Sequence, residues 1–368
     1  MKKIFLSVAA ILLLGSQAYA LGTDAGTNIS NTATLSYKAG GVDQPDVTSN
    51  EDKFVVDKKI DMVLTTDDQT QVEVTPGQQD QVTSYTFKNE GNANQKFKFE
   101  VANLANGEEA DYNDKKDNDE VNNLEIKCTY TDGNGNSQTA DWASSFVIEI
   151  KEDTEANCKV RADIKTAADG GEDGDIMNVE LKSTAYKDDG SAPEEETTGA
   201  DTQDKVDIVF ADGESVKNGA KSGLGSNGGT KGDTAGDGID LARSGYIIKT
   251  PILTVNKTSC PVSDPVNNTD NPKRIPGAYI RYMFDIENKG TSDATSVTLK
   301  DKLNDNLDLS KTKDSAKKDE NQDSCSCSNE PSNDISGDTT VSGQDVEIKN
   351  IGIKSKKHTC VSFEVEIK

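Results

Sequence analysis

The stretch from Ala278 to Gly290, AYIRYMFDIENKG, decides the fold class of this chain. Apolar side chains alternate in it with polar or charged ones, and those on one face are Ile280, Tyr282, Phe284 and Ile286. A period of two residues is typical of a β-strand with one buried face. A Pro-Gly turn at 276–277 precedes the stretch and an Asn-Lys-Gly turn at 288–290 follows it. The stretch therefore predicts one core strand between two chain reversals.

The same alternation recurs along the chain. The apolar faces of the further predicted strands are Phe97, Phe99 and Val101; Leu124, Ile126, Cys128 and Tyr130; Phe146, Ile148 and Ile150; and Val361, Phe363, Val365 and Ile367. No segment has the period of an amphipathic helix. Parallel sheets need crossover helices, so short strands joined by Gly/Asn/Asp turns indicate antiparallel sandwiches. We predict an all-β fold.

The composition changes between Ala211 and Ser244, where Gly, Ser, Asn and Asp dominate and few apolar residues remain. A segment of this kind cannot form a core, so we interpret it as a linker or a long solvated loop. The predicted organisation is an N-terminal sandwich at 21–212, a Gly/Asp-rich linker at 213–245 and a second sandwich at 246–368.

The first twenty residues, MKKIFLSVAAILLLGSQAYA, combine two lysines, an apolar run and an Ala-Tyr-Ala end. This is the pattern of a secretory signal peptide, and we exclude 1–20 from the fold. The apolar run is too short to cross a bilayer, which takes roughly 20 apolar residues. The sequence thus predicts a secreted or cell-surface protein that begins at Leu21 and has no membrane span in its mature chain.

The chain is acidic, with 65 Asp and Glu against 40 Lys and Arg and a formal net charge of -25. Binding to nucleic acid depends on clustered basic residues that displace counterions from phosphate. Nucleic acid is therefore disfavoured as a partner, and cations or basic surfaces are favoured.

Six cysteines in an exported chain predict disulfides. Cys128 and Cys158 lie in the first half and are expected to pair. Three connectivities are open in the second half, whose cysteines are Cys260, Cys325, Cys327 and Cys360. Zinc is the less favoured alternative there, because the set contains no Cys-x-x-Cys and the single histidine is His358.

The second half also contains the segment NPKRIPG at 271–277, the turn at Asn288 to Gly290, and Asp301 at the end of the next predicted strand. In these features it resembles a bacterial conserved-repeat surface domain, the domain of unknown function 11. The similarity covers roughly residues 250–310. The resemblance implies an immunoglobulin-like sandwich on a cell-surface or extracellular protein, and it implies no chemistry.

The sequence contains no recognisable catalytic set. One histidine cannot serve a catalytic triad and a metal cluster together, and we expect His358 to be a solvated residue in a turn. No phosphate-binding or dinucleotide-binding motif is present. Pairs of Asp and Glu are so abundant that none is specific. We therefore expect a protein that is not an enzyme.

Calcium is the one ligand that the composition favours, because Ca²⁺ binds six to eight oxygens from irregular loops. Asp132, Asn134 and Asn136 form one candidate set, in TDGNGNS, and Asp169, Asp173 and Asp175 form another, in ADGGEDGDI. Asp233 and Asp237 in the linker are a third pair. Neither loop completes an EF-hand, and the alternative for each is a set of ordinary turn residues.

The segment Thr27–Tyr37, TNISNTATLSY, also alternates, with Ile29, Ala33, Leu35 and Tyr37 on one face. A strand so close to the mature N-terminus can fill an edge of its own sandwich, which we expect first, or add to the edge of another molecule. We predict a structural or adhesive protein of a matrix, surface layer or fibre, with itself or other surface proteins as partners. The alternative is a monomeric secreted module that binds calcium or another ligand.

Overall fold

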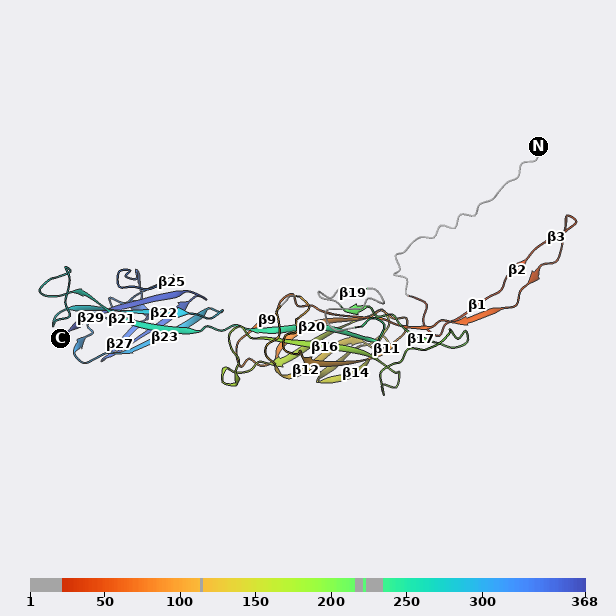
Figure 1. The fold of residues 1–368 in the computed structure, drawn as a ribbon, viewed down its shortest axis with the longest axis horizontal. Helices are drawn as coiled ribbons and strands as arrows, with labels where there is room; N and C mark the ends of the chain where they lie inside the picture. Colours follow the sequence, from red (N-terminus) through yellow and green to blue (C-terminus); the bar gives the residue numbers. More distant parts are fainter. Residues whose placement is uncertain (1–21, 113–114, 216–220, 223–233) are drawn as a thin grey trace, which may run out of the picture.

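The computed structural model describes residues 22–112, 115–215, 221–222 and 234–368. Within this part, the regular elements are β-strands apart from two single-turn 3₁₀ helices, Ala167–Asp169 and Ser336–Asp338. The all-β prediction is confirmed. Figure 1 shows an elongated molecule, with an N-terminal arm at one end, a first sandwich in the middle and a second sandwich at the other end. The predicted signal peptide lies outside the described residues.

The first sandwich has two five-stranded sheets. One has the order β13-β12-β15-β10-β8, and its strands are β8 (Met62–Thr66), β10 (Gln81–Asn89), β12 (Asn122–Thr131), β13 (Ser137–Ala143) and β15 (Glu155–Asp163). The other has the order β14-β11-β16-β20-β9, and its strands are β9 (Val72–Val74), β11 (Gln95–Asn103), β14 (Ser145–Ile150), β16 (Ile176–Tyr186) and β20 (Ile239–Ile248). A short parallel pair at one end joins β7 (Lys58–Ile60) to β17 (Ile208–Phe210).

Aromatic rings fill the centre of the first sandwich. Phe87 lies on β10, and its ring centroid is 4.7 Å from that of Phe97 and 5.0 Å from that of Phe99, both on β11. All three side chains are fully buried. Burial of each such ring stabilises the fold by about 1.5–3 kcal/mol before entropy is counted. The alternation in the sequence thus produces a core between the two sheets.

The second sandwich has one large sheet and one small sheet. The large sheet has the order β21-β22-β29-β25-β26 with β24 also beside β29; its strands are β21 (Leu253–Ser263), β22 (Tyr279–Asn288), β24 (Leu307–Asp308), β25 (Lys317–Gln322), β26 (Asn333–Asp334) and β29 (His358–Ile367). The small sheet has the order β23-β28-β27, with β23 (Ala294–Lys302), β27 (Thr339–Ser342) and β28 (Asp345–Ile353). Phe284, Ile348 and Phe363 are buried between them.

The arm is a two-stranded antiparallel ribbon. It consists of three short ladders: β1 (Asn28–Asn31) with β6 (Asp52–Val55), β2 (Thr34–Leu35) with β5 (Val47–Thr48), and β3 (Lys38–Ala39) with β4 (Val42–Asp43). Gly40 and Gly41 both have positive φ and make the two-residue turn at its tip. The expectation that Thr27–Tyr37 fills an edge of its own sandwich is wrong, because this strand pairs with 42–55 and the ribbon projects from the body (Figure 1).

The predicted linker at 213–245 is wrong at its C-terminal end. Residues 239–245 belong to β20, which pairs with β16 along its length. Leu241 and Ala242 are buried in the first sandwich. A single strand can enter a sheet with few apolar residues when its neighbours supply the hydrogen bonds, which composition alone does not reveal. The chain passes from one sandwich to the other just after Lys249. Residues 216–220 and 223–233, including Asp233, lie outside the described part.

Three disulfides are present. The Cys128–Cys158 bridge is confirmed and joins directly opposite residues of β12 and β15. In the second sandwich Cys260 pairs with Cys327, and Cys325 pairs with Cys360. Each sandwich therefore closes its own bridges, as predicted, and the structure selects one of the three open connectivities.

Candidate functional site

The arm exposes an apolar face. Ile29 lies opposite Phe54, Leu35 opposite Val47, and Ala39 opposite Val42. Residues directly opposite each other in a ladder share a face. Ile29, Leu35 and Ala39 are separated by even numbers of residues, whereas the register to the returning strand shifts by one residue from each ladder to the next. Each ladder therefore contributes one apolar cross-strand pair to the arm. Five large side chains of the arm are between 46% and 64% exposed, and Ile29 is half-buried; the five are Leu35, Tyr37, Val42, Val47 and Phe54.

The first calcium candidate forms the turn between β12 and β13. Asp132 accepts hydrogen bonds from the backbone N–H groups of Asn134 and Asn136, at 3.0 and 2.9 Å, and from the side chain of Gln138. These bonds lower the pKa of the Asp132 carboxyl. The carboxylate thus stabilises the hairpin turn, which is the alternative weighed for this sequence pattern.

The three residues of the second candidate set each bond to different partners. Thr166 caps the 3₁₀ turn that contains Asp169: its Oγ1 accepts from Asp169 N–H and donates to the Asp169 carboxylate. Asp175 accepts from Glu172 N–H and from the Asn118 side chain. Asp173 accepts from Thr250 N–H at 2.9 Å and from Thr291 N–H at 3.0 Å. Thr291 belongs to the second sandwich. Asp173 therefore helps to join the two sandwiches.

One carboxylate cluster is not evident from the sequence pattern. In the described part of the chain, a single group of three potential metal ligands has its ligand atoms within 4.8 Å of one another, and it consists of Asp57, Asp201 and Asp207. The parallel pairing of Lys58 with Ile208 places Asp57 beside Asp207. The backbone N–H of Asp207 also donates to Asp57 Oδ1 at 2.9 Å. Oxygen ligands of this kind suit Ca²⁺. Because 150 residues separate Asp57 from Asp207, local spacing could not reveal the group.

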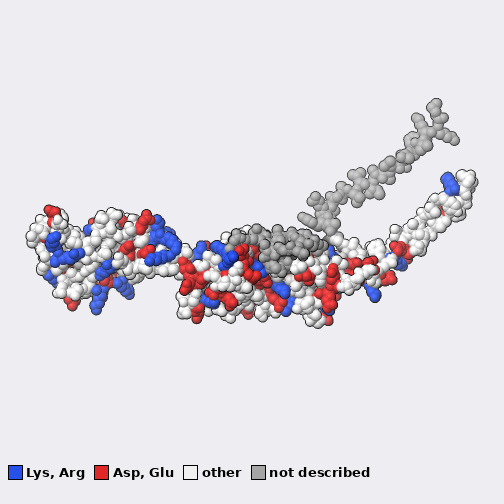
Figure 2. Space-filling model, in the orientation of Figure 1, with Lys and Arg blue, Asp and Glu red and all other residues white. Residues whose placement is uncertain are grey.

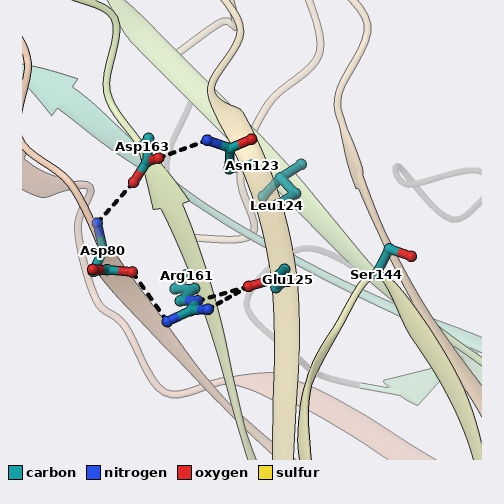
Figure 3. A pocket seen from close by; sticks show the side chains of 7 residues that line it. All are labelled: Asp80, Asn123, Leu124, Glu125, Ser144, Arg161 and Asp163. Carbon is teal, nitrogen blue, oxygen red and sulfur yellow. Dashed lines mark hydrogen bonds and ion pairs between the residues drawn. The ribbon is translucent and has the colours of Figure 1, made fainter.

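A polar pocket of about 470 Å³ lies on the first sandwich, beside β15 and β12 (Figure 3). Arg161 at its centre donates from Nε to Glu125 at 2.9 Å and forms an ion pair with Asp80 at 3.1 Å. Its guanidinium lies 4.6 Å from the centroid of the Trp142 ring. Glu125 raises the pKa of Arg161, and a hydrogen bond from Asn123 lowers that of Asp163. Both shifts move the pKa values further from neutral pH, so Arg161 and Asp163 stay charged there. The pocket is therefore lined by a network of paired charges.

His358 is the first residue of β29, and the expectation of a solvated turn residue is wrong. Its Nδ1 lies 2.6 Å from Asp285 Oδ1 on the neighbouring strand β22, and its side chain is largely buried. The strand pairing of β22 with β29 brings the two together. The single histidine therefore takes part in a cross-strand pair.

Charge is divided unevenly along the molecule. Residues 250–368 have 16 Lys and Arg against 19 Asp and Glu, whereas residues 1–249 have 24 against 46. Figure 2 shows basic residues gathered over the second sandwich and acidic residues over the first sandwich and the base of the arm. The two ends of the molecule therefore differ in electrostatic potential.

These features define an all-β protein of two disulfide-bonded sandwiches with a projecting, partly apolar arm. No helix in the described part of the chain is long and apolar enough to cross a membrane. A scan against protein-family models matches no family, and a search of curated proteins finds no similar sequence. Among solved structures the chain is similar to the CupB6 tip adhesin from Pseudomonas aeruginosa, with 9% identity over 84% of this chain and 88% of that chain and a TM-score of 0.24. A TM-score this low does not establish a common fold.

Proposed function

We propose that this protein is a non-catalytic structural or adhesive subunit of the extracellular space or cell surface, a component of a fibre, surface layer or matrix. In this proposal it binds other copies of itself through the arm, residues 22–56. The observation that carries the proposal is the uncovered apolar face of the arm.

The physical argument concerns the stability of the arm. An isolated two-stranded ribbon is marginally stable in water, and a third strand or a packed face is needed to hold it. At the base of the ribbon Gln203 bonds the backbone of Lys53 and Val55. Beyond that point the edges of the ribbon can add to another strand. Large exposed apolar side chains on such an element favour a binding partner.

The proposed location rests on the disulfides and on the N-terminal pattern. Three bridges with no free cysteine among the described residues suit an oxidising compartment. The predicted signal peptide supports export, with Leu21 as the first residue of the mature protein. Mass spectrometry of the exported protein tests this, and a mature chain that still begins at Met1 would contradict it.

The experiment compares the mature protein with a variant of shortened arm. In the variant an Asn-Gly turn replaces residues 32–51, which keeps the β1–β6 ladder at the base. Size-exclusion chromatography and negative-stain electron microscopy should show extended assemblies for the intact protein and monomers for the variant. Equal melting temperatures of the two would show that the body folds without the distal arm. Intact protein that stays monomeric at all concentrations would overturn the proposal.

The second candidate function is a monomeric secreted calcium- or ligand-binding module, which the carboxylates of Asp57, Asp201 and Asp207 favour. The same chromatography separates the two functions. A monomer that gains stability from calcium would support this second function over self-association.

A further inference from the structure

The two sandwiches have the same strand order. In the first, β8-β10-β15-β12-β13 form one sheet, and in the second β21-β22-β29-β25-β26 follow the same order. On the facing sheets, β11 pairs with β14 as β23 pairs with β28. Strand β21 is therefore the counterpart of β8, and strand β23 is the counterpart of β11.

The counterpart residues of β8 and β21 differ in burial. Met62 and Leu64 on β8 lie opposite Asn89 and Phe87 of β10, and they are 0% and 2% exposed. Leu253 and Val255 on β21 lie opposite Asn288 and Ile286 of β22. Ile286 is in the core, so Leu253 and Val255 are on the core side of their sheet. They are nevertheless 39% and 60% exposed.

The difference lies in what covers them. In the first sandwich β16 pairs with the edge of β11, and β20 pairs with β16 and packs over β8. A carboxylate oxygen of Asp240 on β20 accepts a hydrogen bond from Leu64 N–H at 2.7 Å. The antiparallel pair β16–β20, with the short strand β9 beside β20, thus extends the sheet from β11 and closes this side of the first sandwich.

No described residue takes that place in the second sandwich. Strand β23 pairs with β28 alone, and β21 pairs with β22 alone. The Lys257 side chain extends from β21 over the ring of Tyr282, 4.2 Å from its centroid, and forms an ion pair with Asp301 on β23. The edge strands β21 and β23 and the core-side residues Leu253 and Val255 together form what we term the open side of the second sandwich.

We infer that the arm of a second copy of this chain occupies the open side and completes the second sandwich, as β16 and β20 complete the first. The inference rests on the proposed self-association and names its acceptor. One strand of the arm pairs with β23, and the apolar face of the ribbon covers Leu253 and Val255. This is strand addition to an edge with burial of alternate side chains.

The arm fits this place in form, length and charge. It is an antiparallel ribbon whose strands span Asn28–Ala39 and Val42–Val55, whereas β16 has 11 residues and β20 has 10. Five of its residues are acidic and two are lysines, and the β23 edge exposes Lys300 and Lys302. The arm and the second sandwich lie at opposite ends of the molecule (Figure 1). Such a head-to-tail contact does not close on itself, so it builds a fibre.

Two complementary variants test the inference. The shortened-arm protein keeps the open side but lacks the distal arm that would insert into another copy. A full-length Val255→Lys protein keeps its arm but places a charge on the open side, where loss of one buried valine contact weakens binding about tenfold or more. Val266→Lys is the matched control, since Val266 is 74% exposed in the same sandwich and lies outside β21. Circular dichroism and melting curves check that each variant is folded.

Near the lowest concentration at which the unmodified protein assembles, we expect Val266→Lys to assemble as well and each complementary variant alone to stay monomeric. Their mixture should form a one-to-one complex and nothing longer. If Val255→Lys assembles as well as Val266→Lys, the acceptor is elsewhere and the inference fails while the proposed function stands. If the unmodified protein does not assemble, both fail.

A second measurement uses the assembled full-length protein with the photo-reactive residue benzoylphenylalanine at position 35 in place of leucine. We expect cross-linked peptides from 253–263 or 294–302. Cross-links to the first sandwich, or from arm to arm, would overturn the inference even if the Val255→Lys variant failed to fold.

Discussion

Asn89 of the first sandwich and Asn288 of the second make the same three hydrogen bonds. Each amide oxygen accepts from the N–H of the glycine two residues later, at 3.0 Å in both. Each amide nitrogen donates to the backbone carbonyl four residues later. It also donates to the carbonyl of the last residue of a strand on the facing sheet, which is Ile150 for Asn89 and Ile353 for Asn288. The Asn-x-Gly turn therefore ties the two sheets together in both sandwiches, and its recurrence identifies them as copies of one architecture.

Replacement of Asn288 by alanine should destabilise the second sandwich. The side chain is fully buried, and its loss leaves Gly290 N–H, Ile252 N–H and the Ile353 carbonyl without this partner. The expected cost is about 2–3 kcal/mol. Urea denaturation followed by fluorescence measures it. Asn306→Ala, at an exposed position, should leave the midpoint unchanged.

Gly290→Ala should destabilise the second sandwich at least as much as Asn288→Ala does. A Cβ at this position would lie 2.1 Å from the backbone oxygen of Thr250 and 2.5 Å from Ile252 N. These atoms are backbone atoms of the segment 250–252, so the clash is relieved only by moving the chain that enters the second sandwich. Gly337→Ala is the control, because no atom lies within 4 Å of its added Cβ and its φ is not positive. We expect Gly290→Ala to lower the free energy of unfolding by about 2 kcal/mol or more, and Gly337→Ala to change it by about 1 kcal/mol at most.

Removal of the Cys128–Cys158 bridge by a double change to alanine should lower the free energy of unfolding by about 3–4 kcal/mol on the loop-entropy account. The bridge closes 30 residues of sequence between two buried positions. Peptide mapping without reductant should find the bridges Cys260–Cys327 and Cys325–Cys360 intact in the variant. An unchanged melting temperature would count against a stabilising role for the bridge.

The buried carboxyl of Asp212 should make the stability of the protein depend on pH. Burial raises the pKa of its carboxyl to about 6 in the folded protein, above the ordinary value of about 4. A raised acid pKa means that its stabilising contribution is full below about pH 4 and is lost as the pH rises through 6. Asp212→Asn should therefore be more stable than the unmodified protein at pH 7, by up to about 3 kcal/mol, and equal to it near pH 4. Melting curves at both pH values measure this, and a constant difference between them would contradict it.

Calcium should raise the melting temperature if the carboxylates of Asp57, Asp201 and Asp207 bind it, because a ligand of the folded state alone adds stability. Calorimetry in millimolar calcium and in chelator measures the shift. Asp207→Asn should reduce it, whereas Asp132→Asn, in the β12–β13 turn, should not. If the melting temperature of the unmodified protein is the same in calcium and in chelator, the calcium hypothesis is wrong.

Alternation in the sequence identified the strands that line both cores. Phe97 and Phe99, Ile280 and Phe284, and Phe363 lie on predicted strands and are buried. Their burial follows from a two-residue period, which places every second side chain on one face whatever the partner strand is. The ribbon shape of the arm was not predicted, although Gly40-Gly41 between two alternating segments is a hairpin signal. Strand β20 was missed because its residues Asp240, Arg243 and Ser244 are polar and yet buried.

The sequence by itself determined the fold class, the division of the six cysteines between two halves and the acidic character of the chain, because each depends on local pattern or on simple counting. The tertiary structure decided which residues far apart in the chain become neighbours. It brought Asp57 to Asp207, joined Asp173 to Thr291, paired Cys260 with Cys327, and left Val255 exposed on the core side of its sheet. Each of these depends on strand order and register, and register is set by the whole packed sheet rather than by any one segment.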